Sequence, residues 1–554
     1  MKHIKYIGIM MIAVGLLTAT SCSDFDDYNK VTSDVNASAS QTLWANISGN
    51  PQLSNFAALI KKAGFDDELQ SSTFYTVWAP LDGTYDAASL MASDNATVLK
   101  QFVKNHIASY NYPASGTIDE RIHSLNLKSH TFTGSGSYTY AGMALPQVNL
   151  PSTNGVMHVL NGYAKFYPNL YEYISQGAGI DSLKAYFKKY EYTFLDVSKS
   201  VIGPVVKGKQ TYIDSVMVTY NLMANSLNAN LEEEDSMYTF MMPNNAAWIA
   251  AYNKIKPYYK YASTTYSQVL TDGSTDVNTS KNVSVNAAYM QDSLVKSSIV
   301  SSLIFSNNNS YNKWVENTNA VSTDTISTTT RNKLSNPDAI LAHTVNKFTM
   351  SNGYARVIDS VAYLPWETYA PEHIYTSAYL ARVLNGSKHN VRVDDPDDAM
   401  GDFSKRGLNY LWIQPTSNFS KPELDIYLPN VLSTTYNIYC VVIPADVDLT
   451  DKSTVVKPNQ LKFDLSYATA SGTLATKTLA AALSNDTSKV DTMLVGQFTF
   501  PVAYRGLGDY YPNIKITTPF SVFSTTMMAK YTRDLRIGGI ILRPIELDAY
   551  KPKE

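Results

Sequence analysis

The sequence has few of the residues that several common functions require. Only two of its 554 residues are cysteines, Cys22 and Cys440, so a structural disulfide would have to join these two. The net charge of −3 and the lack of a basic stripe argue against a nucleic-acid-binding protein. No nucleophile elbow, zinc-binding His-Glu-x-x-His, Cys-x-x-Cys pair, phosphate-binding loop or dinucleotide fingerprint occurs. We therefore expect no enzymatic activity, cofactor or metal site, although carboxylate pairs distant in sequence would escape this search.

Long apolar runs are also lacking. Residues 7–19 are apolar, but this run is shorter than the roughly 20 residues of a membrane-spanning helix. Basic residues precede it, and small residues lead from it to Cys22. The segment resembles a bacterial lipoprotein signal, which implies a signal peptide over 1–21 and a lipidated Cys22 that anchors the protein to a membrane. The alternative is an ordinary signal peptide in which Cys22 is incidental.

The stretch 22–40 is polar and has the composition of a flexible tether. Its acidic start, Asp24, Asp26 and Asp27, is similar to the signal that sends lipoproteins of Bacteroides-like bacteria to the outer face of the outer membrane. This resemblance implies a lipid-anchored outer-membrane protein that faces the extracellular side. The alternative is a solvated linker without a sorting role.

The chain of 554 residues is long enough for about three or four domains, and part of it is repeated. Residues 75–80 (Tyr-Thr-Val-Trp-Ala-Pro) and 154–160 (Asn-Gly-Val-Met-His-Val-Leu) have counterparts at 238–243 and 352–358. In each copy a β-rich run ends at a proline, and an Asn-Gly turn starts another run. Helical apolar spacing over 51–63 and 98–107 adds helices to these strands, so the fold class is α+β.

These motifs resemble the fasciclin domain: the Thr42-Leu43-Trp44 start, the two phrases and the pair Asn105-His106. The resemblance implies a mixed β wedge with flanking helices over 41–175, a second such domain with insertions over 176–372, and a role in extracellular adhesion. The family associates a Tyr-His pair with adhesion. Because Asn105 replaces the tyrosine, we expect His106, and likewise His158, to be hydrogen-bonded packing residues.

The second copy differs from the first in its insertions. We expect a helix over 181–194, a strand or hairpin over 212–220 and a surface loop over 262–286. Phe305 is expected near the place of His106, and Arg356 replaces His158. Apolar positions that recur without their histidines indicate a scaffold rather than a shared catalytic site.

The carboxy-terminal third is expected to contain a linker over 373–404 and an all-β domain over 405–554, either a jelly roll or another β-sandwich. Its acidic cluster over 394–402 has two interpretations, a calcium site or a solvated linker. Strands are expected over 410–413, 423–428, 435–443, 460–467, 497–504, 513–517 and 535–542. Cys440 lies within one of these runs and is predicted to be an inert core thiol.

Five residues of this domain form a candidate recognition loop. Aromatic rings could stack on sugar faces, while charged side chains bond hydroxyl groups. The alternative is a turn with its tyrosines packed at the base. The five residues are Tyr504, Arg505, Asp509, Tyr510 and Tyr511.

The sequence thus predicts a surface lipoprotein for adhesion or for capture of a glycan or another ligand. Its partners would be the membrane, through Cys22, a glycan or matrix ligand, and components of an outer-membrane nutrient transporter. The alternative is a structural accessory subunit that binds only a protein partner. Triplets such as Asp181-Ser182-Leu183 resemble the O-glycosylation acceptor of the same bacterial group.

Overall fold

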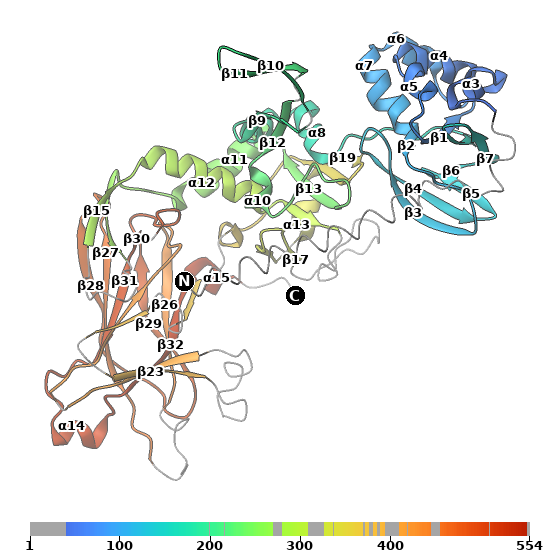
Figure 1. Cartoon of the computed structure of the whole chain (residues 1–554). Helices are drawn as coiled ribbons and strands as arrows, with labels where there is room; N and C mark the ends of the chain where they lie inside the picture. Colours follow the sequence, from blue (N-terminus) through green and yellow to red (C-terminus); the bar gives the residue numbers. More distant parts are fainter. Residues whose placement is uncertain are drawn as a thin grey trace, which may run out of the picture. The chain divides into compact units, whose positions relative to one another are not determined.

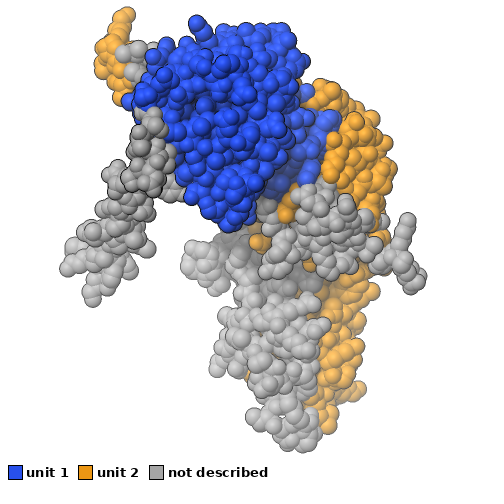
Figure 2. Space-filling model, turned by 90° about the vertical axis from the view of Figure 1, so that its right-hand side faces the viewer, with its two compact units in different colours: residues 1–176, 231–238, 348–355 blue, residues 177–230, 239–347, 356–554 orange. Residues whose placement is uncertain are grey.

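The computed structural model describes residues 40–550 apart from 199, 215–216, 270–279, 308–325, 336, 369–371, 376–380, 385–387, 394–408, 418, 445–454 and 509. Cys22 and the acidic cluster 394–402 lie outside the described residues. The chain divides into two compact units, coloured separately in Figure 2. Unit 1 comprises residues 1–176, 231–238 and 348–355, and unit 2 comprises residues 177–230, 239–347 and 356–554.

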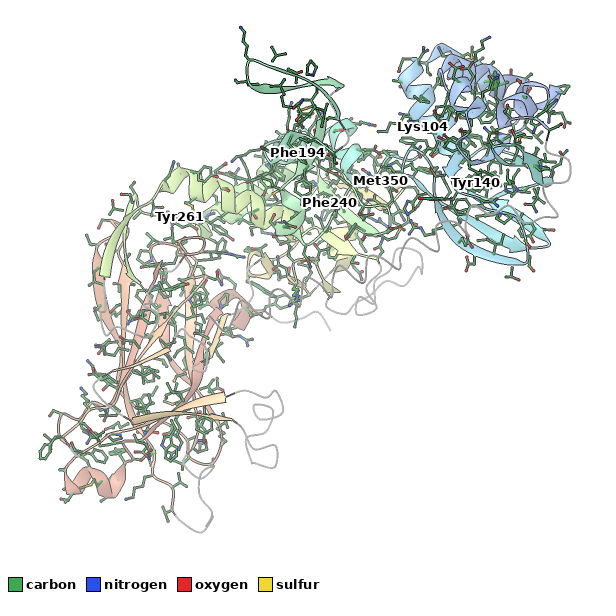
Figure 3. The ribbon with its side chains drawn as sticks, in the orientation of Figure 1. Lys104, Tyr140, Phe194, Phe240, Tyr261 and Met350 are labelled. Carbon is green, nitrogen blue, oxygen red and sulfur yellow. The ribbon has the colours of Figure 1, made fainter. Side chains whose placement is uncertain are left out.

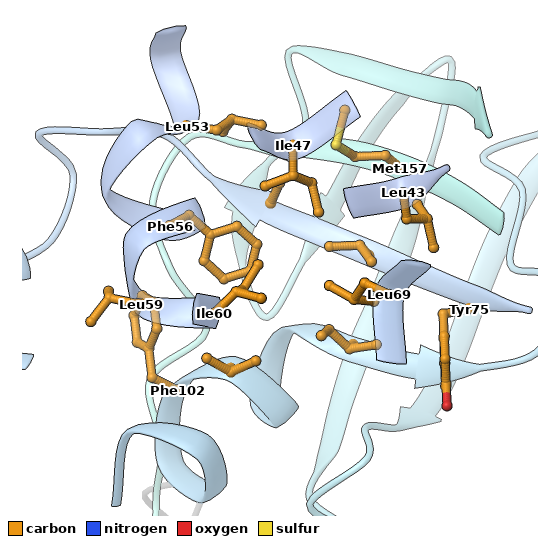
Figure 4. Packing of buried hydrophobic residues seen from close by; sticks show 14 of the residues in the cluster. Leu43, Ile47, Leu53, Phe56, Leu59, Ile60, Leu69, Tyr75, Phe102 and Met157 are labelled. Carbon is orange, nitrogen blue, oxygen red and sulfur yellow. The ribbon is translucent and has the colours of Figure 1, made fainter. Parts of the chain in front are cut away.

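Short helices open the first repeat, as the apolar spacing predicts. In α4 (Ser54–Lys62) the side chains of Phe56, Leu59 and Ile60 are buried on one face. They pack with residues of the neighbouring elements in the core that Figure 4 shows. The other helical segments are α3 (Leu43–Ser48), η2 (Pro51–Leu53), α5 (Asp66–Gln70), α6 (Ala87–Ala92), α7 (Asn95–Val98), η3 (Leu99–Val103) and η4 (Lys104–His106).

The two phrases of the first repeat form adjacent strands. Strand β1 (Tyr75–Pro80) pairs in parallel with β8 (Gly155–Leu160), and every residue of both strands is buried. The sheet has the order β2-β1-β8-β7, in which β2 is Ile107–Ser109 and β7 is Gln147–Ser152. A second sheet of unit 1 has the order β3-β4-β5-β6, formed by Thr117–His123, Ser129–Ser135, Ser137–Tyr140 and Met143–Ala144.

The Asn-Gly turn before β8 fixes the start of the domain. The Asn154 amide donates to the carbonyls of Leu69 and Ser71, and its Oδ1 accepts the Leu43 N–H at 2.8 Å. A Cβ atom on Gly155 would lie 2.1 Å from the Tyr75 carbonyl oxygen, so position 155 must be glycine. The Asn-Gly turn thus links the first helix, α3, to the segment that leads into β1 and to the start of β8.

The second repeat uses the same connection. The Asn352 amide donates to the carbonyls of Leu231 and Glu233, and its Oδ1 accepts the Leu170 N–H at 2.9 Å. A Cβ atom on Gly353 would lie 1.8 Å from the Tyr238 carbonyl oxygen. The sheet order β16-β13-β20-β19 repeats that of the first copy, with strands Ile304–Ser306, Tyr238–Pro243, Gly353–Ile358 and Thr344–Met350.

This correspondence moves two of the predicted positions. Helix α8 (Leu170–Gln176) takes the place of α3, so the second repeat begins before residue 176. Strand β16 begins at Ile304 as β2 begins at Ile107, so Leu303 rather than Phe305 stands at the position of His106. Arg356, the fourth residue of β20, does occupy the position that His158 has in β8.

The insertion after the second repeat's first helices forms paired strands. The predicted helix over 181–194 ends early, as α9 (Asp181–Lys188), because the β-prone Tyr-Thr-Phe run that follows enters β9 (Glu191–Leu195). Strand β9 pairs with β12 (Met217–Asn221), and β10 (Val201–Val206) pairs with β11 (Lys209–Asp214). The predicted strand or hairpin over 212–220 therefore contributes to two separate ladders.

The second repeat has further elements around these strands in the chain. They are α10 (Met223–Leu227), α11 (Asn245–Ile255), η5 (Lys256–Tyr258), α12 (Ala287–Ser301), α13 (Pro337–Leu341), η6 (Pro365–Thr368), β17 (Ile326–Ser327) and β18 (Lys333–Leu334). The expected surface loop over 262–286 instead contains the antiparallel pair β14 (Thr264–Val269) and β15 (Ser280–Ser284). Strand β14 also pairs with β30 (Tyr510–Tyr511), so the insertion and the candidate recognition loop share one sheet.

The carboxy-terminal region is β-rich, as predicted, and its strands form two antiparallel sheets, which Figure 1 shows in orange and red. One has the order β23-β24-β32-β26-β29, with β21 also paired to β32, and the other has the order β22-β25-β31-β27-β28. The strands of the first sheet are β21 (Glu372–Tyr375), β23 (Lys388–Val393), β24 (Asn409–Gln414), β26 (Thr435–Val442), β29 (Asp491–Thr499) and β32 (Leu535–Pro544). Those of the second are β22 (Ala381–Leu384), β25 (Glu423–Tyr427), β27 (Gln460–Ala468), β28 (Leu474–Ser484) and β31 (Asn513–Thr517). The region also has two short helices, α14 (Thr525–Lys530) before β32 and α15 (Ile545–Ala549) after it.

Two sequence predictions for this region are wrong. The expected linker over 373–404 supplies strands β21, β22 and β23, each paired with a strand of the later region. The expected strand over 497–504 is the end of β29, which stops at Thr499. Strand β28 was not predicted, because its Ala-rich sequence has low β propensity and it is an edge strand that needs only one partner.

Candidate functional site

The predicted recognition loop has two of its rings in the core of unit 2. Tyr504 is 2% exposed, and its hydroxyl oxygen accepts the Ala468 N–H at 2.6 Å. Tyr511 is also buried, with its ring against that of Tyr427 at 6.5 Å. Neither ring offers a free face on which a sugar could stack.

The other three residues of the loop are differently placed. The Arg505 guanidinium lies 3.4 Å from the Tyr259 hydroxyl, and the Arg505 carbonyl accepts a hydrogen bond from Tyr261, a residue labelled in Figure 3. Tyr510 is in β30, and Asp509 lies outside the described residues. The structure therefore connects Arg505 to the second repeat, and the role of this loop in sugar binding stays a prediction.

Unit 1 contains a second candidate site, a cavity of ≈ 500 Å³. Its volume lies within the roughly 300–1,000 Å³ of small-molecule sites. Of the described residues that line it, none is aspartate or glutamate, and hydroxyls come from Thr84, Ser129, Thr131 and Ser351. The side chains that set its chemistry are Lys128, His130, Met143, Tyr163, Lys165 and Tyr167.

A buried ion cluster forms the floor of this cavity. Lys128 is 3% exposed, and its Nζ donates to Glu172 Oε2 at 2.7 Å and to Glu234 Oε1 at 2.8 Å. Burial alone would raise the pKa of Glu172, but hydrogen bonds from Lys100 and Lys128 leave that pKa below its usual value. The positive charge of Lys128 is thus already balanced by carboxylates and is not free for a ligand.

His130 presents an uncharged ring to the cavity. Its Nε2 donates to Asn105 Oδ1 at 2.9 Å, and the same oxygen accepts a hydrogen bond from Asn126. Burial, and to a smaller extent the electrostatic effects of His106 and Lys128, lowers the pKa of His130 to about 3. The neutral ring therefore keeps Nδ1 as an acceptor, and this atom has no hydrogen-bond partner among the described residues.

The two histidines predicted to be packing residues are buried and hydrogen-bonded. His106 Nδ1 donates to the Phe102 carbonyl at 2.7 Å, and its Nε2 accepts the Ala164 N–H at 2.9 Å. His158 Nε2 donates to the Tyr112 carbonyl at 2.9 Å. Burial lowers the pKa of each to about 4, so both rings are neutral at pH 7. This prediction from the sequence is confirmed.

The mouth of the cavity combines aromatic, apolar and cationic groups. Tyr163 is 36% exposed, and its inner side packs against Phe102 at 6.2 Å between ring centroids. The exposed Lys165 has its ammonium 5.1 Å from the Tyr167 ring. A Cβ atom on Gly162 would lie 2.6 Å from Met143 Sδ, so the glycine lets the methionine approach this segment.

Sequence reasoning missed this site. Its residues come from the loop after β1, from the start of β4, from β6 and the turn before it, from the segment after β8 and from the end of β19, so no short motif contains them. The weak local signal was the run after the second phrase, where Tyr163, Lys165 and Tyr167 alternate. Such alternation alone does not distinguish a binding site from an exposed strand.

A second exposed surface is the apolar ladder, which we define as the exposed side chains of β9 and β12 in unit 2. Tyr192 and Phe194 are 60% and 42% exposed, and their rings stack at 6.1 Å. Figure 3 labels Phe194 on this insertion. Tyr220 lies opposite Tyr192 on β12, and Met217 is 57% exposed. A group of large exposed side chains of this kind is typical of an interaction surface.

Comparison with known proteins assigns a family to part of the chain. Residues 51–163 match the model of the fasciclin domain. No curated protein matches the chain.

Several solved structures are similar to parts of the chain. A FAS1 domain pair from the insect cell adhesion molecule fasciclin I is 12% identical and covers 58% of this chain and 99% of its own, with a TM-score of 0.21. The CBM22-1 xylan-binding domain of Paenibacillus barcinonensis Xyn10C is 12% identical and covers 31% of this chain and 93% of its own, with a TM-score of 0.20. The CBM22-1–GH10 modules of Clostridium thermocellum xylanase 10B, complexed with xylohexaose, are 10% identical and cover 31% of this chain and 28% of their own, with a TM-score of 0.19.

Two further properties concern the described part of the chain only. Within it, no helix is long and apolar enough to cross a membrane. Nor do its histidine, cysteine, aspartate and glutamate side chains form a group of three or more that could hold a metal ion. Cys440 is buried on β26, where burial raises the pKa of its thiol well above the usual value.

Proposed function

We propose that this chain is a non-enzymatic, lipid-anchored surface protein that captures a glycan for adhesion or for an outer-membrane nutrient uptake system. The observation that carries the proposal is the cavity of unit 1, in which Tyr163 and Tyr167 lie beside hydroxyl, amine and imidazole groups. Aromatic faces pack against the apolar faces of sugar rings, while polar groups bond the hydroxyls. The fasciclin domain that carries most of the cavity is of a kind associated with adhesion.

Replacing Tyr163 by alanine should weaken glycan binding by at least about fivefold, because a partly exposed ring supplies more than about 1 kcal/mol when it packs against a ligand. The measurement is isothermal titration calorimetry of the full chain against a panel of polysaccharides. Tyr289→Ala, which removes an exposed ring of unit 2, is the matched control and should bind normally. Binding that survives Tyr163→Ala but is lost in Tyr510→Ala would move the site to the predicted loop.

We propose that Cys22 carries the lipid anchor and that the protein faces outward from the outer membrane. Cys22→Ala should release the protein from membranes into the soluble fraction, because the acyl chains would be missing. Protease treatment of intact cells should digest the wild-type protein. A Cys22→Ala protein that stays in the membrane would contradict the anchor, and a protein resistant on intact cells would contradict outward display.

The apolar ladder favours a second function, a structural subunit that binds a protein partner. Phe194→Ser together with Tyr192→Ser should abolish co-purification of a membrane partner, because large exposed apolar side chains are the usual anchors of interfaces. The melting temperature should change little, since both side chains are exposed. Leu474→Ser, an exposed apolar residue on β28, is the control. Unchanged co-purification in the double variant would exclude this surface.

A further inference from the structure

The charges around the cavity of unit 1 are not evenly balanced. Lys128 at its floor faces Glu172 and Glu234, so this cation is neutralised. Lys165 at the mouth has no carboxylate partner in the part of the chain that the structure describes, and its ammonium is held only near the Tyr167 ring. Lys165 is therefore the cationic group that a bound ligand can use.

The free acceptor that lines the same cavity, on His130, has the complementary requirement. Because His130 Nε2 is engaged by Asn105, its Nδ1 is the free ring nitrogen, and it accepts but does not donate. The Thr84 hydroxyl is engaged with the carbonyls of Leu81 and Gly162. A ligand that satisfies the site must thus bring a hydroxyl donor to His130 and an anionic acceptor to Lys165.

The walls favour a ligand larger than a bare inorganic anion. Met143, Tyr163 and Met350, the last labelled in Figure 3, add apolar surface, and the volume of ≈ 500 Å³ greatly exceeds that of a single ion. Apolar surface, a hydroxyl acceptor and one free cation together match a sugar ring that carries an acidic group.

We propose that this cavity binds acidic saccharides, with the acidic group of one sugar on Lys165 and a hydroxyl of that sugar on His130 Nδ1. This inference rests on the proposed function and narrows it to a ligand class. A carboxylate, as in uronic acids, and a sulfate ester offer the same anionic oxygens to Lys165. The carboxylate is the smaller group and the better match for one ammonium.

The test is calorimetry of the full chain with a galacturonic acid oligosaccharide, with its carboxyl-reduced form and with a sulfated galactose oligosaccharide. The acidic forms should bind at least about tenfold more tightly than the reduced form, as expected for one charge-assisted hydrogen bond. Added salt should weaken the acidic forms more than the neutral form, because salt screens exposed charges. Binding of the sulfated form alone would overturn the carboxylate assignment and show that the acidic group on Lys165 is a sulfate ester.

Lys165→Met should lower the affinity for the acidic sugar to that of the reduced sugar and leave the reduced sugar unaffected. Lys104→Met is the matched control, because Lys104 also belongs to unit 1 and also lies over an aromatic ring, that of Phe65 at 5.8 Å. Equal binding of the acidic and reduced sugars, or no effect of Lys165→Met, would overturn the inference. In that case, binding of neutral sugar that depends on Tyr163 would still support glycan capture. Binding of no sugar at all would overturn both.

Discussion

Acidification from pH 7 to about pH 4.5 should unfold unit 1. The three histidines His106, His130 and His158 have folded-state pKa values of about 4, about 3 and about 4, against about 6.5 in an unfolded chain. As the pH falls below 6.5, the unfolded chain takes up protons that the folded chain excludes. Each histidine then lowers the free energy of unfolding by about 2–3 kcal/mol at pH 4.5, and together they approach the whole stability of a typical domain, about 5–15 kcal/mol.

The sign follows from the direction of the shifts. A histidine with a depressed folded-state pKa has its full stabilising effect above pH 6.5 and loses it as the pH falls towards the folded value. The lowered pKa of Glu172 acts in the same direction at still lower pH. Hydrogen exchange of the peptide that contains β8 (Gly155–Leu160) is a suitable measurement, because this strand is fully buried in unit 1.

One variant separates the histidines from other acid effects. His130→Gln keeps a donor for Asn105 but does not titrate, so the loss of stability between pH 7 and 4.5 should shrink by about 2–3 kcal/mol. His343→Gln, which changes an exposed histidine of unit 2, should leave the pH profile of unit 1 unchanged. If unit 1 remained folded at pH 4, or if His130→Gln behaved as the wild type, the account of the neutral histidines would be wrong.

Lys128→Met should destabilise unit 1 by about 3–5 kcal/mol. The substitution leaves Glu172 Oε2 and Glu234 Oε1 without the ammonium that they share. The second oxygen of Glu234, Oε2, is buried and already has no partner among the described residues. The other donors to Oε1, the Ser351 hydroxyl at 2.9 Å and the Asn169 amide at 3.4 Å, are uncharged and do not replace the ammonium. Removing one member of a buried ion pair costs far more than removing an exposed charge.

Urea unfolding monitored by hydrogen exchange of unit 1 measures this effect. Lys165→Met, which removes the exposed lysine of the same cavity, should cost less than about 1 kcal/mol. Adding Glu234→Gln to Lys128→Met should restore part of the loss, because the uncompensated charge is then removed. A Lys128→Met protein as stable as the wild type would show that the cluster contributes nothing to unit 1.

Local patterns explain which parts of the fold could be predicted. The stripe Phe56, Leu59 and Ile60 has helical spacing, and the two phrases are apolar runs with prolines and Asn-Gly turns at their ends. The counterpart of His106 was misassigned to Phe305 instead of Leu303. Apolar residues lie on both sides of position 303, and the strand start at Ile304 has no sequence signal. The linker was misassigned because β21, β22 and β23 are short, and because β21 and β22 pair with strands that are distant in the sequence, β32 and β25.

The candidate site depended almost entirely on distant contacts. The chain by itself determined the repeat, the buried character of β1 and β8, and the packing role of His106, because each rests on residues a few positions apart. Only the tertiary structure brought Lys128 to Glu234 and Ser351, which are 106 and 223 positions further along the chain. It also buried Tyr504 and Tyr511, and it left Lys165 without a carboxylate in the described part of the chain. Burial and charge balance are properties of a residue's neighbours in space, and a local pattern does not contain them.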